Sequence, residues 1–93
     1  MLTETPYPYD NAAEQAVLGS LLIDQDAYHD VAGIVTADMF YRPQHRTIYE
    51  AISTLISSSQ AVDIITVPAA MGDSSTETRD YLIDLLNTPE SSL

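Results

Sequence analysis

The chain has 93 residues, 45% of them hydrophobic, and a formal net charge of −11 that arises from fourteen Asp and Glu against three Arg. This length suits one domain with one small core, and the hydrophobic content argues against disorder. A surface so acidic and without lysine disfavours direct nucleic-acid binding, because such binding depends on basic side chains that displace phosphate counterions.

Signals for membrane insertion or secretion are missing from the sequence. No run of about 18 apolar residues could cross a bilayer, and the N-terminal stretch MLTETPYPYD lacks the basic and apolar segments of a signal peptide. Cysteine, needed for disulfides and thiolate metal sites, is also absent. We expect a soluble cytoplasmic domain without membrane contact. The preferred explanation of its acidic surface is solubility, and the alternative is that it binds partners with basic faces.

The first predicted helix follows an extended arm at residues 1–10, where two prolines disfavour helical backbone. Asn11 is expected to cap this helix, with Glu14 at capping-box spacing. Gly19 would let another element pack closely against the helix. The apolar side recurs at helical spacing and comprises Ala13, Val17, Leu18, Leu21 and Leu22.

A short second helix is predicted after the acidic capping cluster at residues 24–26. Its apolar positions are Tyr28, Val31, Ala32 and Val35. The tripeptide Met39-Phe40-Tyr41 is then expected to wedge apolar side chains under the next helix. That next helix is the longest in the chain, beginning near Pro43 and ending in the serine tract at residues 57–59. Its apolar face comprises His45, Ile48, Tyr49, Ile52, Leu55 and Ile56.

Two arginines break a local rule at the start of this long helix. Arg42 and Arg46 lie in its first turn, where the helix dipole disfavours a cation by about 0.3–1 kcal/mol. One explanation is that they neutralise carboxylates such as Asp38 and Glu50. The other is that they contact a partner.

The last third of the chain predicts two further helices. Residues 62–67 are rich in β-branched side chains, but a strand there would have no partner strand. Thr66 is instead expected to cap a short helix that ends at Gly72. After a polar loop at residues 73–77, the final helix carries Tyr81, Leu82, Leu85 and Leu86 and ends at Pro89.

The predicted fold class is therefore all-α, a compact bundle of about five short helices joined by short loops. We expect residues 11–89 to form a single helical domain, preceded by the arm at 1–10 and followed by the start of a linker at 90–93. The expected core contains Val17, Leu18, Leu21, Phe40, His45, Ile48, Ile52 and Leu85.

A search for catalytic or ligand-binding motifs predicts no catalytic, metal or cofactor site. Asp24 and Asp26 begin like a calcium loop, but later positions lack the required ligands and glycine. The three glycines are scattered and no lysine exists to bind phosphates. His29 and Asp30 are expected on an exposed polar face. His45 is expected to be a hydrogen-bonded, half-buried histidine, the alternative being a ligand or the base of a small hydrolase.

The sequence has six tyrosines, and this residue type favours interfaces as well as the edges of small cores. Tyr41 stands beside Arg42 and Arg46, a combination of aromatic and arginine side chains that often anchors a partner. This cluster is a candidate partner interface.

Four blocks of sequence carry a family resemblance. NAAEQAVLGS at 11–20, DMFYRPQHRTIY at 38–49, VDIITV at 62–67, and the pair Tyr81-Leu82 with NTP at 87–89 follow one another along nearly the whole chain. In this order they resemble the N-terminal domain of DnaB-type bacterial replicative DNA helicases.

The resemblance implies a non-catalytic helical head that precedes a linker and an ATPase motor, with ATP and Mg bound only by that motor, which this segment lacks. It implies a place in the collar of a hexamer and recruitment of primase through the primase C-terminal region, with a helicase loader as a further candidate partner. It assigns Phe40, His45, Ile48 and Tyr49 to the core. It also adds Tyr81 and Leu82 to the candidate partner interface, where they are expected to lie on or under the partner-facing surface.

The chain also departs from the family pattern. Residues 72–78 are shorter than usual and lack a pair of glycines before Tyr81, so we expect a different loop. The sequence ends at Leu93, where the family continues into a helical hairpin that pairs two heads, so pairing by that route is not expected of this segment. The alternative hypothesis is a free-standing acidic adaptor or inhibitor, bacterial or phage-encoded, with the same fold and competing for helicase partners.

Overall fold

The computed structural model of the chain describes residues 11–87. This part contains five α-helices and no strand, so the predicted all-α class is confirmed. The helices are α1 (Asn11–Ile23), α2 (Tyr28–Val31), α3 (Pro43–Ser57), α4 (Thr66–Met71) and α5 (Thr76–Leu86), with 3₁₀ turns η1 (Gln25–Ala27) and η2 (Ala37–Met39). The expected arm at 1–10, helix end at Pro89 and linker at 90–93 lie outside the described residues.

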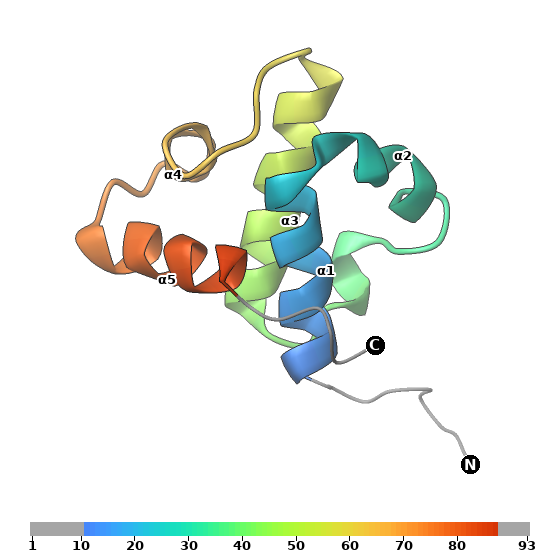
Figure 1. The fold of residues 1–93 in the computed structure, drawn as a ribbon, viewed down its shortest axis with the longest axis horizontal. Helices are drawn as coiled ribbons and strands as arrows, with labels where there is room; N and C mark the ends of the chain where they lie inside the picture. Colours follow the sequence, from blue (N-terminus) through green and yellow to red (C-terminus); the bar gives the residue numbers. More distant parts are fainter. Residues whose placement is uncertain (1–10, 88–93) are drawn as a thin grey trace.

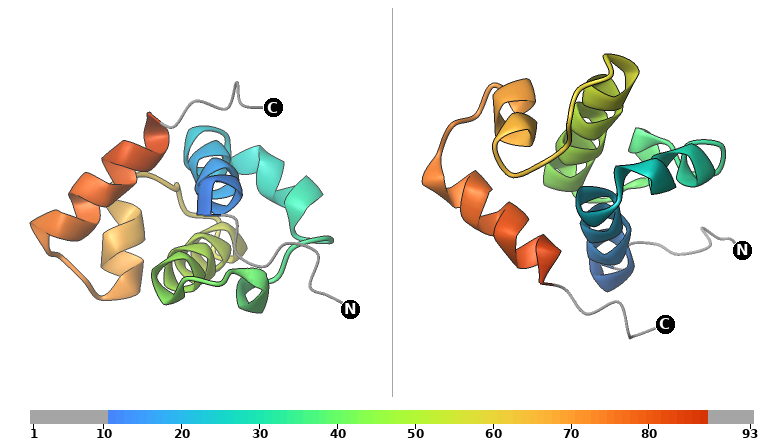
Figure 2. Two further views of the ribbon diagram at one scale, coloured as in Figure 1. Left: turned by 90° about the horizontal axis from the view of Figure 1, so that it is seen from below. Right: turned by 45° about the horizontal axis from the view of Figure 1, so that its top comes forward.

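Helices α1 and α3 lie side by side at the centre of the fold (Figure 1). Helix α5 packs against α1, and α4 packs against α3 (Figure 2). On the other side, η1 leads from α1 into α2, and η2 returns the chain to α3. Each outer helix thus covers one of the two central helices, and the core lies between them.

The buried side chains come mainly from α1, α3 and α5. They include seven of the eight residues expected in the core: Leu18, Leu21, Phe40, His45, Ile48, Ile52 and Leu85. Val17 is only partly buried and packs against this cluster. Val62, Val67 and Leu82 are buried with them. No helix within residues 11–87 has the length and apolar character needed to span a membrane.

Helices α1 and α5 approach each other closely at Gly19. A Cβ atom added at this position would lie 2.5 Å from the carbonyl oxygen of Leu85. No side chain tolerates such a distance to a backbone atom, so only glycine lets the helices cross here. The expected close packing at Gly19 is therefore confirmed.

Helix α4 has the predicted position but a different cap. Gly72 ends the helix with φ 71°, a left-handed conformation that suits glycine, as predicted. At the other end, Thr66 lies inside the helix. The carboxylate of Asp63 accepts hydrogen bonds from the N–H groups of Ile65 and Thr66, both at 2.8 Å. The predicted cap at Thr66 was wrong, because the longer reach of Asp63 satisfies two donors at once.

Helix α5 begins at Thr76, so the predicted loop at 73–77 was too long. Ser75 is its N-cap, with Oγ accepting a hydrogen bond of 3.2 Å from the N–H of Thr78. Asp73 supports this start, because its carboxylate accepts from the Ser75 N–H at 2.9 Å and from the Thr78 hydroxyl at 2.6 Å. The side chains of Asp73 and Ser75 therefore let the helix begin at Thr76, earlier in the sequence than predicted.

The tripeptide at 39–41 does not act as one apolar wedge. Phe40 is 4% exposed, whereas Met39 is 52% and Tyr41 60% exposed. The backbone at Phe40 is extended, and in extended chain neighbouring side chains point to opposite sides. Only the middle residue can then face the core.

Candidate functional site

A buried polar network joins three helices around His45. This histidine, in the first turns of α3, has no exposed surface. Its Nδ1 lies 2.7 Å from a carboxylate oxygen of Glu14 on α1, and its Nε2 lies 2.6 Å from the hydroxyl of Tyr81 on α5. The Tyr81 ring also stacks on the imidazole at 5.8 Å between centroids. Gln15 completes the network by donating from Nε2 to the Tyr81 hydroxyl at 3.2 Å.

Both nitrogens of His45 are therefore satisfied. In the neutral imidazole, Nδ1–H donates to Glu14 while Nε2 accepts from the Tyr81 hydroxyl. In the imidazolium, both nitrogens donate and Glu14 supplies the countercharge. The expectation of a hydrogen-bonded histidine is confirmed, and His45 is fully buried where half burial was expected. The hydrolase alternative is wrong, because no solvent or substrate reaches the ring.

Glu14 also connects the network to the surface. Its second oxygen accepts a 2.7 Å hydrogen bond from the backbone N–H of Tyr41, just before α3. Burial alone raises the pKa of this carboxyl, but the hydrogen bonds from Tyr41 and His45 outweigh it and lower the pKa below its ordinary value. The capping-box role predicted for Glu14 was wrong, because the carboxylate is engaged by residues 27 and 31 positions away.

Arg42 and Arg46 do not neutralise carboxylates in the described part of the chain. Arg42 donates from Nη1 to the side-chain oxygen of Asn11 at 3.2 Å. Arg46 donates from Nη2 to the carbonyl oxygen of Tyr41 at 3.1 Å. Within residues 11–87, the one ion pair is that between Glu14 and His45. Asp38 and Glu50 are therefore not their partners, because the arginines turn toward α1 and the loop before α3.

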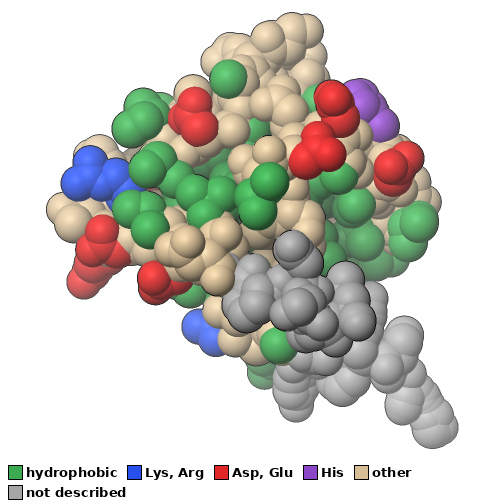
Figure 3. All heavy atoms as spheres, in the orientation of Figure 1, with side chains coloured by type: hydrophobic (Ala, Val, Ile, Leu, Met, Phe, Trp, Pro, Cys, Tyr) green, Lys and Arg blue, Asp and Glu red, His purple; other side chains and the backbone are tan. Residues whose placement is uncertain are grey.

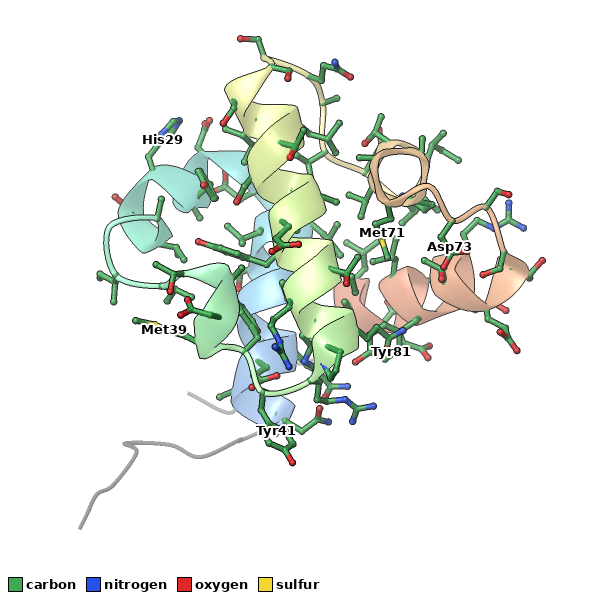
Figure 4. All side chains as sticks on the ribbon, turned by 180° about the vertical axis from the view of Figure 1, so that it is seen from behind. His29, Met39, Tyr41, Met71, Asp73 and Tyr81 are labelled. Carbon is green, nitrogen blue, oxygen red and sulfur yellow. The ribbon has the colours of Figure 1, made fainter. Side chains whose placement is uncertain are left out.

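These contacts hold an exposed surface cluster in place. We call Asn11, Tyr41, Arg42 and Pro43 the Tyr41 face; together they line a hollow of about 420 Å³. Tyr41 lies at the end of the molecule where α3 begins (Figure 4). Its backbone is fixed from both sides, through its N–H by Glu14 and through its carbonyl by Arg46.

The other candidate interface residues lie deeper. Tyr81 is partly buried and lies between α5 and the start of α3 (Figure 4). Leu82 has no exposed surface, so in this conformation it lies under the surface of the domain, and its expected role at a partner interface stays a prediction. It faces inward because it belongs to the apolar stripe that α5 packs onto α1.

The remaining polar candidates form no binding constellation. Within residues 11–87, no three His, Asp or Glu side chains are placed to hold a metal ion. Asp24 instead accepts a 3.1 Å hydrogen bond from the N–H of Asp26 and caps η1, as predicted. His29 points away from the molecule on α2 (Figure 4). Gln15 was not predicted to be part of a site, and its spacing from Tyr81 in sequence carries no signal.

Comparison with known proteins identifies the family. Residues 6–93 match the family model described as the DnaB-like helicase N terminal domain. The chain is 43% identical over 60 residues to the replicative DNA helicase DnaB of Leifsonia xyli subsp. xyli, covering 64% of this chain and 13% of that protein. It is 42% identical over 64 residues to the same helicase of Mycobacterium leprae, covering 69% of this chain and 11% of that protein.

A solved structure is also similar. The crystal structure of the N-terminal domain of DnaB helicase from Mycobacterium tuberculosis matches with a TM-score of 0.78 and 35% identity, over 89% of this chain and 62% of that one. The chain thus spans only about an eighth of the length of the two helicases above. The family model nevertheless matches almost every residue of the chain. The chain therefore belongs to the family of DnaB-like helicase N-terminal domains.

Proposed function

We propose that this chain is the non-catalytic interaction domain of a replicative DNA helicase, helping to build the hexamer collar and recruiting primase during DNA replication. The observation that carries this proposal is the family match over residues 6–93. On this proposal ATP and Mg bind in the motor of the whole helicase. The domain contributes protein contacts.

The Tyr41 face is the best candidate for the primase contact. Interface hot spots are enriched in tyrosine and arginine, and Tyr41 is 60% exposed beside Arg42. The hydrogen bonds from Tyr41 to Glu14 and from Arg46 to Tyr41 keep this face ordered before binding. A preordered face loses less conformational entropy when a partner binds.

Tyr81 has an indirect role in this proposal. Its hydroxyl holds His45, whose other nitrogen holds Glu14, and Glu14 accepts from the Tyr41 N–H. The chain of hydrogen bonds therefore runs from α5 to the Tyr41 face. Tyr81 is a positioning residue for that face, and its partly buried ring leaves little surface for a partner.

The test is binding of the C-terminal region of the cognate primase to this chain, measured by isothermal titration calorimetry. Tyr41→Ala should weaken binding at least about fivefold, the loss expected of a hot spot above 1 kcal/mol. Ile23→Ala is the matched control, because Ile23 is 63% exposed at the far end of α1. It should leave affinity unchanged. Equal affinities of both variants and the unmodified chain would count against the Tyr41 face.

A further inference from the structure

Helix α4 lies between two shallow hollows. The hollow toward α5, of about 180 Å³, is lined by Ile64, Ile65, Pro68, Ala69 and Arg79 together with two serines. The hollow toward α3, of about 300 Å³, is lined mainly by small and polar residues and by Leu55. We call this surface the α4 face. In Figure 3, hydrophobic side chains gather over α4 and α5 beside a basic group.

We propose that the α4 face is a docking site for a protein segment that presents an apolar side chain together with a carboxylate. This inference concerns a second surface and does not rest on the proposed function. Figure 4 places Asp73, between α4 and α5, far from Tyr41. A segment bound at the α4 face would therefore leave the Tyr41 face accessible.

The apolar part of the site is exposed to solvent. Ile65, which lines the smaller hollow at the start of α4, is 65% exposed. Ala69 lines both hollows, so a partner can approach the helix closely between them. A cavity of about 150 Å³ is large enough for a benzene-sized group. The hollow of about 180 Å³ therefore suits one apolar side chain better than a whole cofactor.

The charged side chains around the two hollows indicate which charge a partner segment would carry. No aspartate or glutamate lines either hollow, although the chain has fourteen of them. Three carboxylates adjoin a lining residue in sequence: Asp63, Asp73 and Asp80, which directly follows Arg79. Asp63 and Asp73 accept hydrogen bonds from their own neighbours, which lower the pKa of each. They are thereby turned toward the backbone and hydroxyl groups of the domain.

Arg79 supplies the positive charge at this face. The side chains of Arg42 and Arg46 donate to Asn11 and to the Tyr41 carbonyl. The Arg79 side chain is exposed and lines the smaller hollow. No residue within 11–87 accepts a hydrogen bond from this side chain or forms an ion pair with it. A guanidinium pairs with a carboxylate through two parallel hydrogen bonds. A carboxylate beside an apolar anchor therefore complements this face.

The test uses three fluorescein-labelled 14-residue helical peptides that share a leucine face and carry glutamate, glutamine or lysine at its two flanking positions. We expect the glutamate peptide to bind the 93-residue chain most tightly by fluorescence anisotropy and the lysine peptide about tenfold more weakly. Amide shifts on binding should centre on Ile65, Ala69 and Arg79. Equal affinities, shifts centred elsewhere, or no binding at millimolar concentration would overturn the proposal.

Charge reversal separates this site from general electrostatics. Arg79→Glu should invert the order, so that the lysine peptide binds more tightly than the glutamate peptide. Arg42→Glu changes the net charge equally at the distant Tyr41 face and should keep the original order. The same inversion in both variants would overturn the proposal. Concentration-dependent shifts at the α4 face without peptide would also overturn it, because they would identify a second copy of the chain as the occupant.

Discussion

Removal of one hydroxyl group tests whether the His45 network holds the fold together. In Tyr81→Phe the aromatic ring remains, so its stacking on the imidazole at 5.8 Å is retained. The variant loses the hydroxyl that lies 2.6 Å from His45 Nε2. Because His45 has no exposed surface, water cannot replace this partner. The substitution thus isolates one buried hydrogen bond.

The expected loss follows from burial. A buried polar group left without its partner costs about 1–3 kcal/mol, more than the net value of an exposed hydrogen bond. For a domain of this size, each kcal/mol lowers Tm by about 4–8 °C. Urea unfolding followed by circular dichroism should show a lower midpoint with an unchanged slope, which identifies a change in stability and not in compactness.

The matched control is Tyr28→Phe. Tyr28 is also partly buried and its ring packs on Tyr49 at 6.0 Å, but within residues 11–87 its hydroxyl has no hydrogen-bond partner. The control should change the free energy of unfolding by less than about 0.5 kcal/mol. If Tyr81→Phe loses no more than the control, the network does not stabilise the fold and the reasoning is refuted.

Two further predictions concern α1. Gly19→Ala should destabilise the domain by about 1–3 kcal/mol in the same unfolding assay, because the new Cβ would collide with the Leu85 carbonyl. Gly33→Ala, with nothing within 4 Å of the new Cβ, should be neutral or slightly stabilising, and equal losses would contradict the packing argument. The lowered native pKa of Glu14 means that its stabilisation is complete above the ordinary glutamate pKa and is lost as pH falls through the native value. Glu14→Gln should flatten this acid limb of a stability profile, and an unchanged limb would exclude Glu14 as its source.

The fold was largely predictable because its helices have local causes. The period of apolar residues predicted α3, and Pro43 and the serines at its end predicted its bounds. Gly72 likewise predicted the end of α4. The starts of α4 and α5 were less predictable, since Asp63 and Asp73 reach over several residues to satisfy backbone or hydroxyl donors. Several residues near each start could cap, and the sequence does not rank them.

The site was predictable only in part, because its contacts are long-range. Capping-box spacing gave Glu14 a local role, yet its partner His45 lies 31 positions away. The charges of Arg42 and Arg46 suggested carboxylate partners. Packing of α1 against α3 instead brings the side-chain oxygen of Asn11 to Arg42, and the backbone carbonyl of Tyr41, just before α3, accepts from Arg46. The family resemblance pointed to Tyr81 and Leu82 together. It did not predict that Tyr81 forms a hydrogen bond to His45 whereas Leu82 is buried in the core.

The central claim, that this domain recruits primase through the Tyr41 face, is tested most directly by mapping the contact. The measurement is the change in backbone amide shifts of the ¹⁵N-labelled chain on saturation with the C-terminal region of the cognate primase. We predict that the largest changes fall at residues 41–46 and at Asn11, with smaller ones at Tyr81 through the His45 network. Changes centred on α2, or no changes at saturating primase, would contradict the claim.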